Sequence, residues 1–79
     1  MNVIEVTQKL IAHKRVYAIR QDWTAKRCRK FREDHGVSLR ECARRMGVSA
    51  SFLSDLELGR RNWNARIICN MVKAVLKEE

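Results

Sequence analysis

Three glycines and no proline punctuate this chain, and their spacing restricts it to short helices. Gly36, Gly47 and Gly59 lie eleven and twelve residues apart, and each follows a stretch with helical periodicity. Glycine readily adopts the left-handed conformation that closes many helices, because it has no Cβ to clash with the backbone. The helices between these glycines can therefore span no more than about three turns.

The residues at which helices would begin are equally clear. Ser38-Leu39-Arg40-Glu41 has the pattern of a capping box, in which the hydroxyl and the carboxylate each satisfy a free backbone amide. Thr24, Ser49 and Asn64 are suitable caps for three further helices. Each cap follows an apolar residue that has another apolar residue five positions later, which is the spacing of a hydrophobic staple. The four pairs are Trp23/Cys28, Val37/Cys42, Val48/Leu53 and Trp63/Ile68.

These signals predict helices over residues 24–34, 39–46, 50–58 and 65–77. Apolar residues recur at helical spacing within them and predict inner faces that meet in one core. The inner-face positions are Cys28, Phe31, Leu39, Cys42, Ala43, Met46, Leu53, Leu56, Ile68, Met71, Val72 and Val75. A chain of 79 residues has room for one such core. The expected fold class is all-α, a compact bundle of four to five short helices.

Residues 1–22 form an N-terminal segment outside the predicted domain of residues 23–79, and two structures remain open for it. A helical stripe is formed by Val3, Val6, Leu10 and Ile11, whereas the frequent Val, Ile, Thr and Tyr residues allow a short hairpin. That hairpin would turn near His13-Lys14. We favour a helix, because no Gly, Asn or Pro marks the turn.

The charge balance indicates a polyanionic partner. Seventeen Lys and Arg against nine Asp and Glu give a net charge of +8, and the excess is spread along the chain. Nucleic acid is the commonest partner of so basic a protein, although solvated basic faces are the simpler alternative. No apolar run approaches the ~20 residues of a membrane span, and no signal-peptide core is visible. We therefore expect no membrane partner and a cytoplasmic location.

The cysteines, histidines and tryptophans show no pattern of a metal or catalytic site. Three cysteines at irregular spacing argue against a disulfide framework, and Cys28, Cys42 and Cys69 are better explained by core packing. Their separations match no ligand motif, and no nucleophile with a base and an oxyanion site is visible. Trp23 and Trp63 occupy staple positions, which favours packing over base stacking. We expect no metal, no cofactor and no enzymatic activity.

Residues 38–58 have the layout of a helix-turn-helix, in which two short helices are joined by Gly47-Val48-Ser49 and the small Ala43 lets them approach. Here the chain resembles the XRE-type family, which includes lambda Cro and the lambdoid phage repressors. The similarity runs from about residue 24 to 77. It rests on Arg32-Glu33-x-x-Gly36-Val37-Ser38, then Glu41-Cys42-Ala43-x-x-Met46-Gly47-Val48-Ser49, and Leu53-Ser54-x-Leu56-Glu57-x-Gly59-Arg60-Arg61-Asn62.

The resemblance implies a lambda repressor-like fold whose helix 50–58 enters the major groove of double-stranded DNA. The base-reading residues would be Ala50, Ser51, Phe52, Ser54 and Asp55. The phosphate-contacting residues would be Ser38, Arg40, Ser49, Arg60, Arg61 and Asn62. Leu39 stands where the family often has Gln, so Arg40 would take over its phosphate contact. Arg32 and Glu57 match positions that the family pairs as a partly buried, structural salt bridge.

The chain has small residues and one acid where the family often reads bases with Gln or Arg. Asp55 could accept a hydrogen bond from cytosine N4, Ser51 could pair with several base edges, and Ala50 or Phe52 could contact a thymine methyl. The alternative for Asp55 is a surface salt bridge with Arg44 or Arg60.

We therefore predict a sequence-specific transcriptional regulator of bacterial or phage type, a repressor without a small-molecule ligand. One helix-turn-helix reads few base pairs, so a homodimer on a palindromic operator with half-sites about 34 Å apart is expected. Residues 1–22 would supply the dimer interface or else cover helix 65–77. The alternative function is a protein-interaction module on the same fold, such as an antitoxin or adaptor. Bound to DNA, the regulator would lie on the nucleoid.

Overall fold

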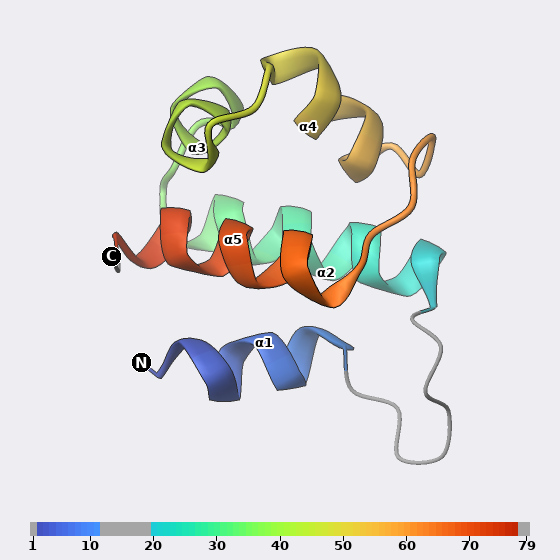
Figure 1. The fold of residues 1–79 in the computed structure, drawn as a ribbon, viewed down its shortest axis with the longest axis vertical. Helices are drawn as coiled ribbons and strands as arrows, with labels where there is room; N and C mark the ends of the chain where they lie inside the picture. The colour runs from blue at the N-terminus through green and yellow to red at the C-terminus, as the bar shows by residue number, and fades with distance from the viewer. Residues whose placement is uncertain (1, 12–19, 78–79) are drawn as a thin grey trace.

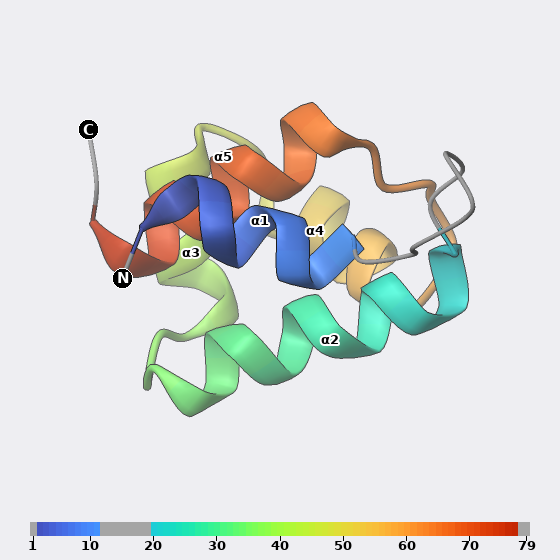
Figure 2. The same cartoon turned by 90° about the horizontal axis from the view of Figure 1, so that it is seen from below.

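A computed structural model of the chain describes residues 2–11 and 20–77 (Figure 1). These residues form five helices and no strand, so the predicted all-α bundle is confirmed. The helices are α1 (Val3–Ile11), α2 (Gln21–Asp34), α3 (Leu39–Met46), α4 (Ala50–Glu57) and α5 (Ala65–Leu76). The structure forms three layers, with α2 and α5 side by side in the middle, α3 and α4 on one side and α1 on the other (Figure 1). Seen from below, α1 lies across the seam between α2 and α5 (Figure 2).

The helix ends follow the local signals in three of the four predicted helices. Ser38, Ser49 and Asn64 each accept a hydrogen bond from the backbone amide three residues later, at 3.1, 3.0 and 2.8 Å. Gly47 closes α3 with a φ of +74°, a conformation that side chains rarely adopt. The reciprocal half of the capping box is not formed among the described residues, because the Glu41 carboxylate pairs instead with two arginines of α3.

The predicted start of the first of these helices at Thr24 is wrong. α2 begins at Gln21, and Thr24 is fully buried inside it, with a hydroxyl that has no hydrogen-bond partner in the described structure. The start is stabilised by a tertiary contact, since Gln21 Nε2 donates to the carbonyl oxygen of Trp63 at 2.8 Å and Gln21 Oε1 accepts from the Trp63 amide. A search for local caps cannot find a partner 42 residues away.

One core joins all five helices. Its fully buried centre comes from α2 to α5, and consists of Cys28, Cys42, Leu53, Leu56, Ile68, Met71 and Val72. Val6 and Leu10 of α1 extend the same cluster, while Phe31 and Leu39 are only partly buried against it. Residues 3–11 are thus helical and cover α5, one of the two arrangements considered. The predicted turn near His13-Lys14 lies outside the described residues.

Candidate nucleic-acid interface

The outer layer of α3 and α4 carries the residues that the sequence singled out for DNA. α4 places Leu53, Leu56 and Glu57 in the bundle, so its opposite side faces outward. Four of the five predicted base-reading residues line one shallow groove on that side. The groove is bordered by Leu39, Ala50, Ser51, Ser54, Asp55 and Arg60. Because the side chains of Ala50, Ser51 and Ser54 are short, an incoming base edge can approach the backbone of α4 closely there.

Phe52 is the predicted base-reading residue that does not line this groove. Its ring is partly buried against the core, and the guanidinium carbon of Arg61 lies 5.1 Å from the ring centroid. At this distance a cation attracts the face of an aromatic ring. Phe52 therefore supports Arg61 as well as the packing of α4.

The loop after α4 brings two arginines to the edge of the groove. The side chains of Arg60 and Arg61 are 71% and 56% exposed. Arg60 Nη1 lies 3.8 Å from Asp55 Oδ1, and Arg61 Nε lies 3.7 Å from Asp55 Oδ2. Both separations exceed hydrogen-bond length, so these are loose ion pairs. Of the two salt-bridge partners considered for Asp55, Arg60 lies near it, whereas Arg44 pairs with Glu41.

The end of this loop is anchored in the core. Trp63 is 2% exposed, and its indole Nε1 donates to the carbonyl oxygen of Leu56 at 3.0 Å. Its backbone is held by Gln21, as described above. Sequence reasoning missed the role of Gln21, because nothing in the residues around position 21 signals a partner in the loop. The two loop arginines therefore extend from a backbone that is fixed at both ends, by α4 and by Trp63.

The remaining phosphate-contact candidates lie at helix ends and in the loop. Ser38 and Ser49 accept the capping bonds of α3 and α4, and a hydroxyl that accepts still has its hydrogen to donate. Arg40 in the first turn of α3 and Asn62 in the loop are both exposed. The amino-terminal end of α3 also presents free amides, which favour an anion there.

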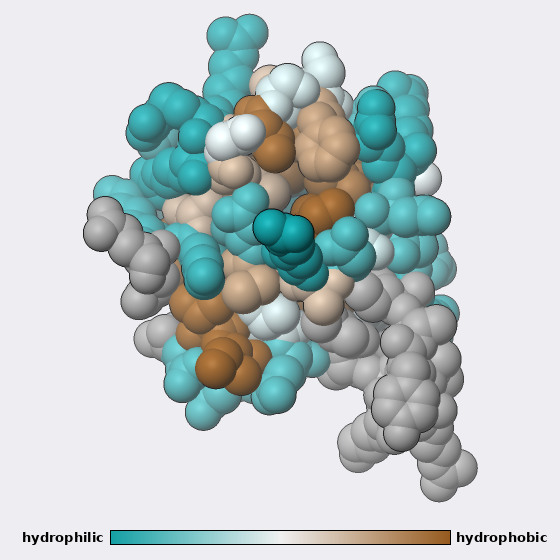
Figure 3. Space-filling view, viewed as in Figure 1, coloured by the Kyte–Doolittle hydropathy of each residue, from teal (hydrophilic) through white to brown (hydrophobic). Residues whose placement is uncertain are grey.

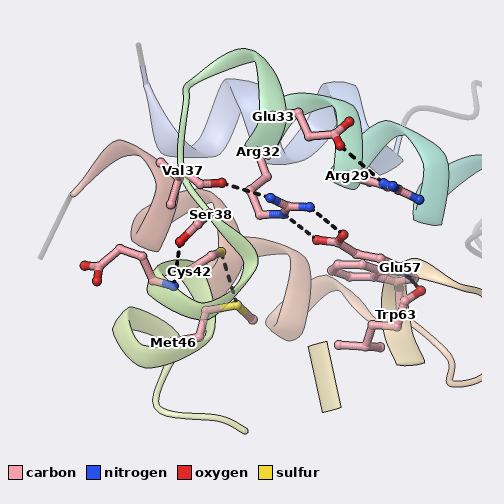
Figure 4. A network of polar contacts seen from close by, with 11 residues as sticks. Arg29, Arg32, Glu33, Val37, Ser38, Cys42, Met46, Glu57 and Trp63 are labelled. Atoms are coloured by element: carbon pink, nitrogen blue, oxygen red, sulfur yellow. Dashed lines mark hydrogen bonds and ion pairs between the residues drawn. The ribbon is translucent and has the colours of Figure 1, made fainter. Parts of the chain in front are cut away.

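A buried ion pair fixes the carboxyl end of α4 to α2 (Figure 4). Arg32 donates from Nε and Nη2 to the two carboxylate oxygens of Glu57, at 2.7 and 2.9 Å, and from Nη1 to the carbonyl oxygen of Val37 at 2.9 Å. Arg32 and Glu57 are 7% and 8% exposed. The hydrogen bonds to Glu57 raise the pKa of Arg32 above its ordinary value. This pair holds α4 in place. Because the two buried charges neutralise each other, the pair adds no net charge to the groove.

Two of the three thiols, those of Cys28 and Cys42, are buried in the core. Burial raises the pKa of Cys28, and it raises the pKa of Cys42 to about 11. Cys42 Sγ contacts Met46 Sδ at 3.8 Å (Figure 4). Over residues 2–11 and 20–77, no group of His, Cys, Asp and Glu could hold a metal ion. None of the helices in these residues has the length and hydrophobicity of a membrane span.

Comparison with known proteins identifies the segment that contains this groove. A family model described as a helix-turn-helix domain matches residues 25–75, which is more than half of the chain. The matched segment runs from α2 to α5 and leaves α1 outside. No curated protein and no solved structure matches the chain significantly.

Proposed function

The chain belongs to the helix-turn-helix domain family, as its XRE-like sequence predicts, and from this premise we propose that it is a sequence-specific transcriptional regulator that inserts α4 into the major groove of double-stranded DNA. The observation that carries this proposal is the groove on the outer side of α4, with short polar side chains inside it and Arg60 at its edge. A net charge of +8 supports the same partner.

In this proposal the groove residues read bases and the surrounding residues grip phosphates. Ser51, Ser54 and Asp55 supply the hydrogen-bonding groups, and Ala50 can contact a thymine methyl. Phe52 lies outside the groove, so any base contact it makes is at the groove's margin. Phosphates are assigned to Ser38, Arg40, Ser49, Arg60, Arg61 and Asn62. These contacts fix the register of the protein on the duplex but carry no sequence information.

We propose a homodimeric repressor on a palindromic operator in the cytoplasm. Two copies on half-sites one turn apart would double the short sequence that one α4 can read. Apolar side chains gather over the amino-terminal part of α1 (Figure 3), where Ile4 is 66% exposed. This patch lies on the side of the bundle opposite α4, so a two-fold contact through it would point the two α4 helices away from each other, and it does not supply the dimer proposed here. Occupying a promoter excludes polymerase without any further surface, which favours repression.

Selection from a randomised DNA pool tests the proposal, followed by salt titration of the selected duplex by fluorescence anisotropy. We expect an enriched palindrome and a log K that falls steeply and linearly with log[salt]. Arg60→Ala should weaken binding to the selected duplex and reduce its salt slope by about 1. Lys9→Ala is the matched control, since it removes one charge from α1, on the opposite side of the bundle. Absence of enrichment together with a shallow slope would contradict the proposal.

A second function is favoured by one observation. Leu58, directly after α4, is 55% exposed, although a surface that grips phosphate gains little from an apolar side chain. A protein-interaction module on this fold would bury Leu58 against a partner protein. If the chain is such a module, Leu58→Ser should abolish partner binding and leave DNA binding unchanged. If it is a DNA-binding regulator, Arg60→Ala should weaken DNA binding and leave any protein binding unchanged.

A further inference from the structure

An acidic residue lies in the middle of the surface proposed to face DNA. The Asp55 side chain is 34% exposed and lines the groove beside Ser51 and Ser54. A carboxylate in this place repels phosphates, so it should weaken binding unless it has a partner in the complex. Its present partners are the guanidinium groups of Arg60 and Arg61, at 3.8 and 3.7 Å.

These two ion pairs restrain the arginines without locking them. Neither distance is short enough for a hydrogen bond, and both arginine side chains are more than half exposed. A phosphate oxygen offers each guanidinium a short, charge-assisted hydrogen bond, which is stronger than the pair it replaces. While the carboxylate lies beside both arginines, it offsets one of the two positive charges that the loop offers to DNA.

The backbone allows the exchange without any movement of the loop. The amide of Arg60 donates to the carbonyl oxygen of Asp55 at 2.8 Å, and Gly59 turns the chain there with a φ of +78°. Arg61 also lies over the Phe52 ring, a contact that keeps its guanidinium beside α4 when it leaves the carboxylate. Rotation of the arginine side chains is therefore sufficient.

When the arginines leave, the Asp55 carboxylate faces the bases without a partner. An unpaired charge in a desolvated interface is costly. On non-cognate DNA, where no base donates a hydrogen bond to the carboxylate, transfer of the arginines to phosphates is therefore unfavourable. A cytosine at the facing position changes this, because its N4 amino group donates a hydrogen bond in the major groove, where Asp is a known acceptor.

We propose that Asp55 makes the phosphate contacts of Arg60 and Arg61 conditional on the base that it faces. On non-cognate DNA the carboxylate retains the arginines. On a site with cytosine at that position, the amino group takes their place and both arginines pass to phosphates. Asp55 thereby determines specificity mainly by penalising the wrong sequence. This inference rests on the proposed function, because it requires α4 in the major groove.

The first test is Asp55→Asn, with Asp34→Asn as the matched control. Asp34 on α2 pairs with Lys30 at 3.3 Å, so both variants remove one exposed, ion-paired carboxylate and the same charge. Anisotropy at fixed salt gives Kd for the selected duplex and for an unrelated duplex. We expect Asp55→Asn to tighten binding to the unrelated duplex about threefold to tenfold more than Asp34→Asn does, since two exposed ion pairs are released. For Asp55→Asn, the affinity for the selected duplex divided by the affinity for the unrelated duplex should be smaller than in the wild type.

The second test repeats Asp55→Asn in the background Arg60→Ala/Arg61→Ala. The gain on unrelated DNA should disappear there, because no arginine remains to be released. A gain that persists would mean that Asp55 merely repels phosphates, and it would overturn the exchange. Thermal melts of every variant check that the bundle is intact.

Repeating the pool selection with both proteins separates this inference from the proposal beneath it. The wild-type site should contain cytosine at one fixed position of each half-site, and Asp55→Asn should lose that preference. If the wild-type protein selects no site, the proposed function fails and the inference with it. If it selects a site but Asp55→Asn matches Asp34→Asn in every Kd, only the inference fails.

Discussion

Arg32→Ala tests directly what holds α4 against the bundle. The substitution removes three hydrogen bonds, two of them to Glu57 and one to the carbonyl oxygen of Val37. It leaves the Glu57 carboxylate, in a residue 8% exposed, without its counter-ion. Removing one partner of a buried pair costs about 3–5 kcal/mol, because the remaining charge stays desolvated.

That cost is a large part of what a domain of this size has. At about 0.05–0.15 kcal/mol per residue, a 79-residue chain has a free energy of unfolding of about 4–12 kcal/mol. Each kcal/mol shifts Tm by about 4–8 °C in a domain of this length, so Tm should fall by about 12 °C or more. Urea denaturation followed by circular dichroism measures the loss. Arg29→Ala is the control, since its pair with Glu33 is half exposed and should contribute at most about 1 kcal/mol.

A double variant identifies the cause of the loss. Arg32→Met/Glu57→Leu removes both charges and keeps the volume, so most of the stability lost in Arg32→Ala should return. If Arg32→Ala is as stable as Arg29→Ala, the reasoning is refuted, because a buried carboxylate would then need no counter-ion. If Arg32→Ala is unstable and the double variant equally so, the loss comes from packing or from the unpaired carbonyl of Val37.

Three smaller predictions concern acid stability, thiol reactivity and capping. Two arginines of α3 lower the pKa of Glu41 to about 2 from 4.5, so its contribution to stability is complete above pH 4.5 and is lost as the pH falls towards 2. Glu41→Gln should flatten the stability curve in that window, and an unchanged curve would speak against these ion pairs. A thiol reagent at pH 8 should modify only Cys69 rapidly in the folded protein and all three cysteines after denaturation; rapid reaction of Cys28 or Cys42 would contradict their burial. Asn64→Ala should lower the free energy of unfolding by about 1 kcal/mol, whereas Asn64→Asp keeps the cap of α5 and should not; equal urea midpoints for the two variants would refute the role of this cap.

The sequence predicts the helices whose ends are encoded by neighbouring residues. Residues 39–46 form α3 as predicted, and α4 ends at Glu57, one residue before the prediction. Serine caps and glycines act within four residues, so a local pattern is enough to find them. The start of α2 could not be found in this way, because the contact between Gln21 and Trp63 exists only after the loop has folded against the bundle.

In the candidate site too, local sequence predicts some features, whereas others depend on tertiary contacts. Ala50, Ser51, Ser54 and Asp55 lie at positions i, i+1, i+4 and i+5, so helical periodicity alone predicts that they share one side. Phe52 is one step of about 100° beyond Ser51, which accounts for its place outside the groove. The approach of Arg61 to Asp55 was not predictable, since the path of a loop depends on tertiary anchors and not on periodicity.

The residues that anchor the interface and the residues that carry its charge can be substituted separately. Effects on stability and effects on DNA binding can therefore be told apart. The backbone around α4 is held by the Arg32–Glu57 pair at one end, the Ser49 cap at the other, and the buried Trp63 beyond the loop. The charges of Asp55, Arg60 and Arg61, in contrast, are joined by loose pairs at 3.7–3.8 Å, with both arginine side chains more than half exposed. Substitutions of Arg32, Glu57 or Trp63, which contact no phosphate in the proposal, should change DNA affinity only as far as they unfold the bundle. Substitutions of the loosely paired residues should change affinity and its dependence on salt while Tm stays the same. A loop arginine whose removal lowered Tm as much as the loss of Arg32 would show that the loop charges hold the fold, and the exchange proposed for Asp55 would then have no free side chains to work with.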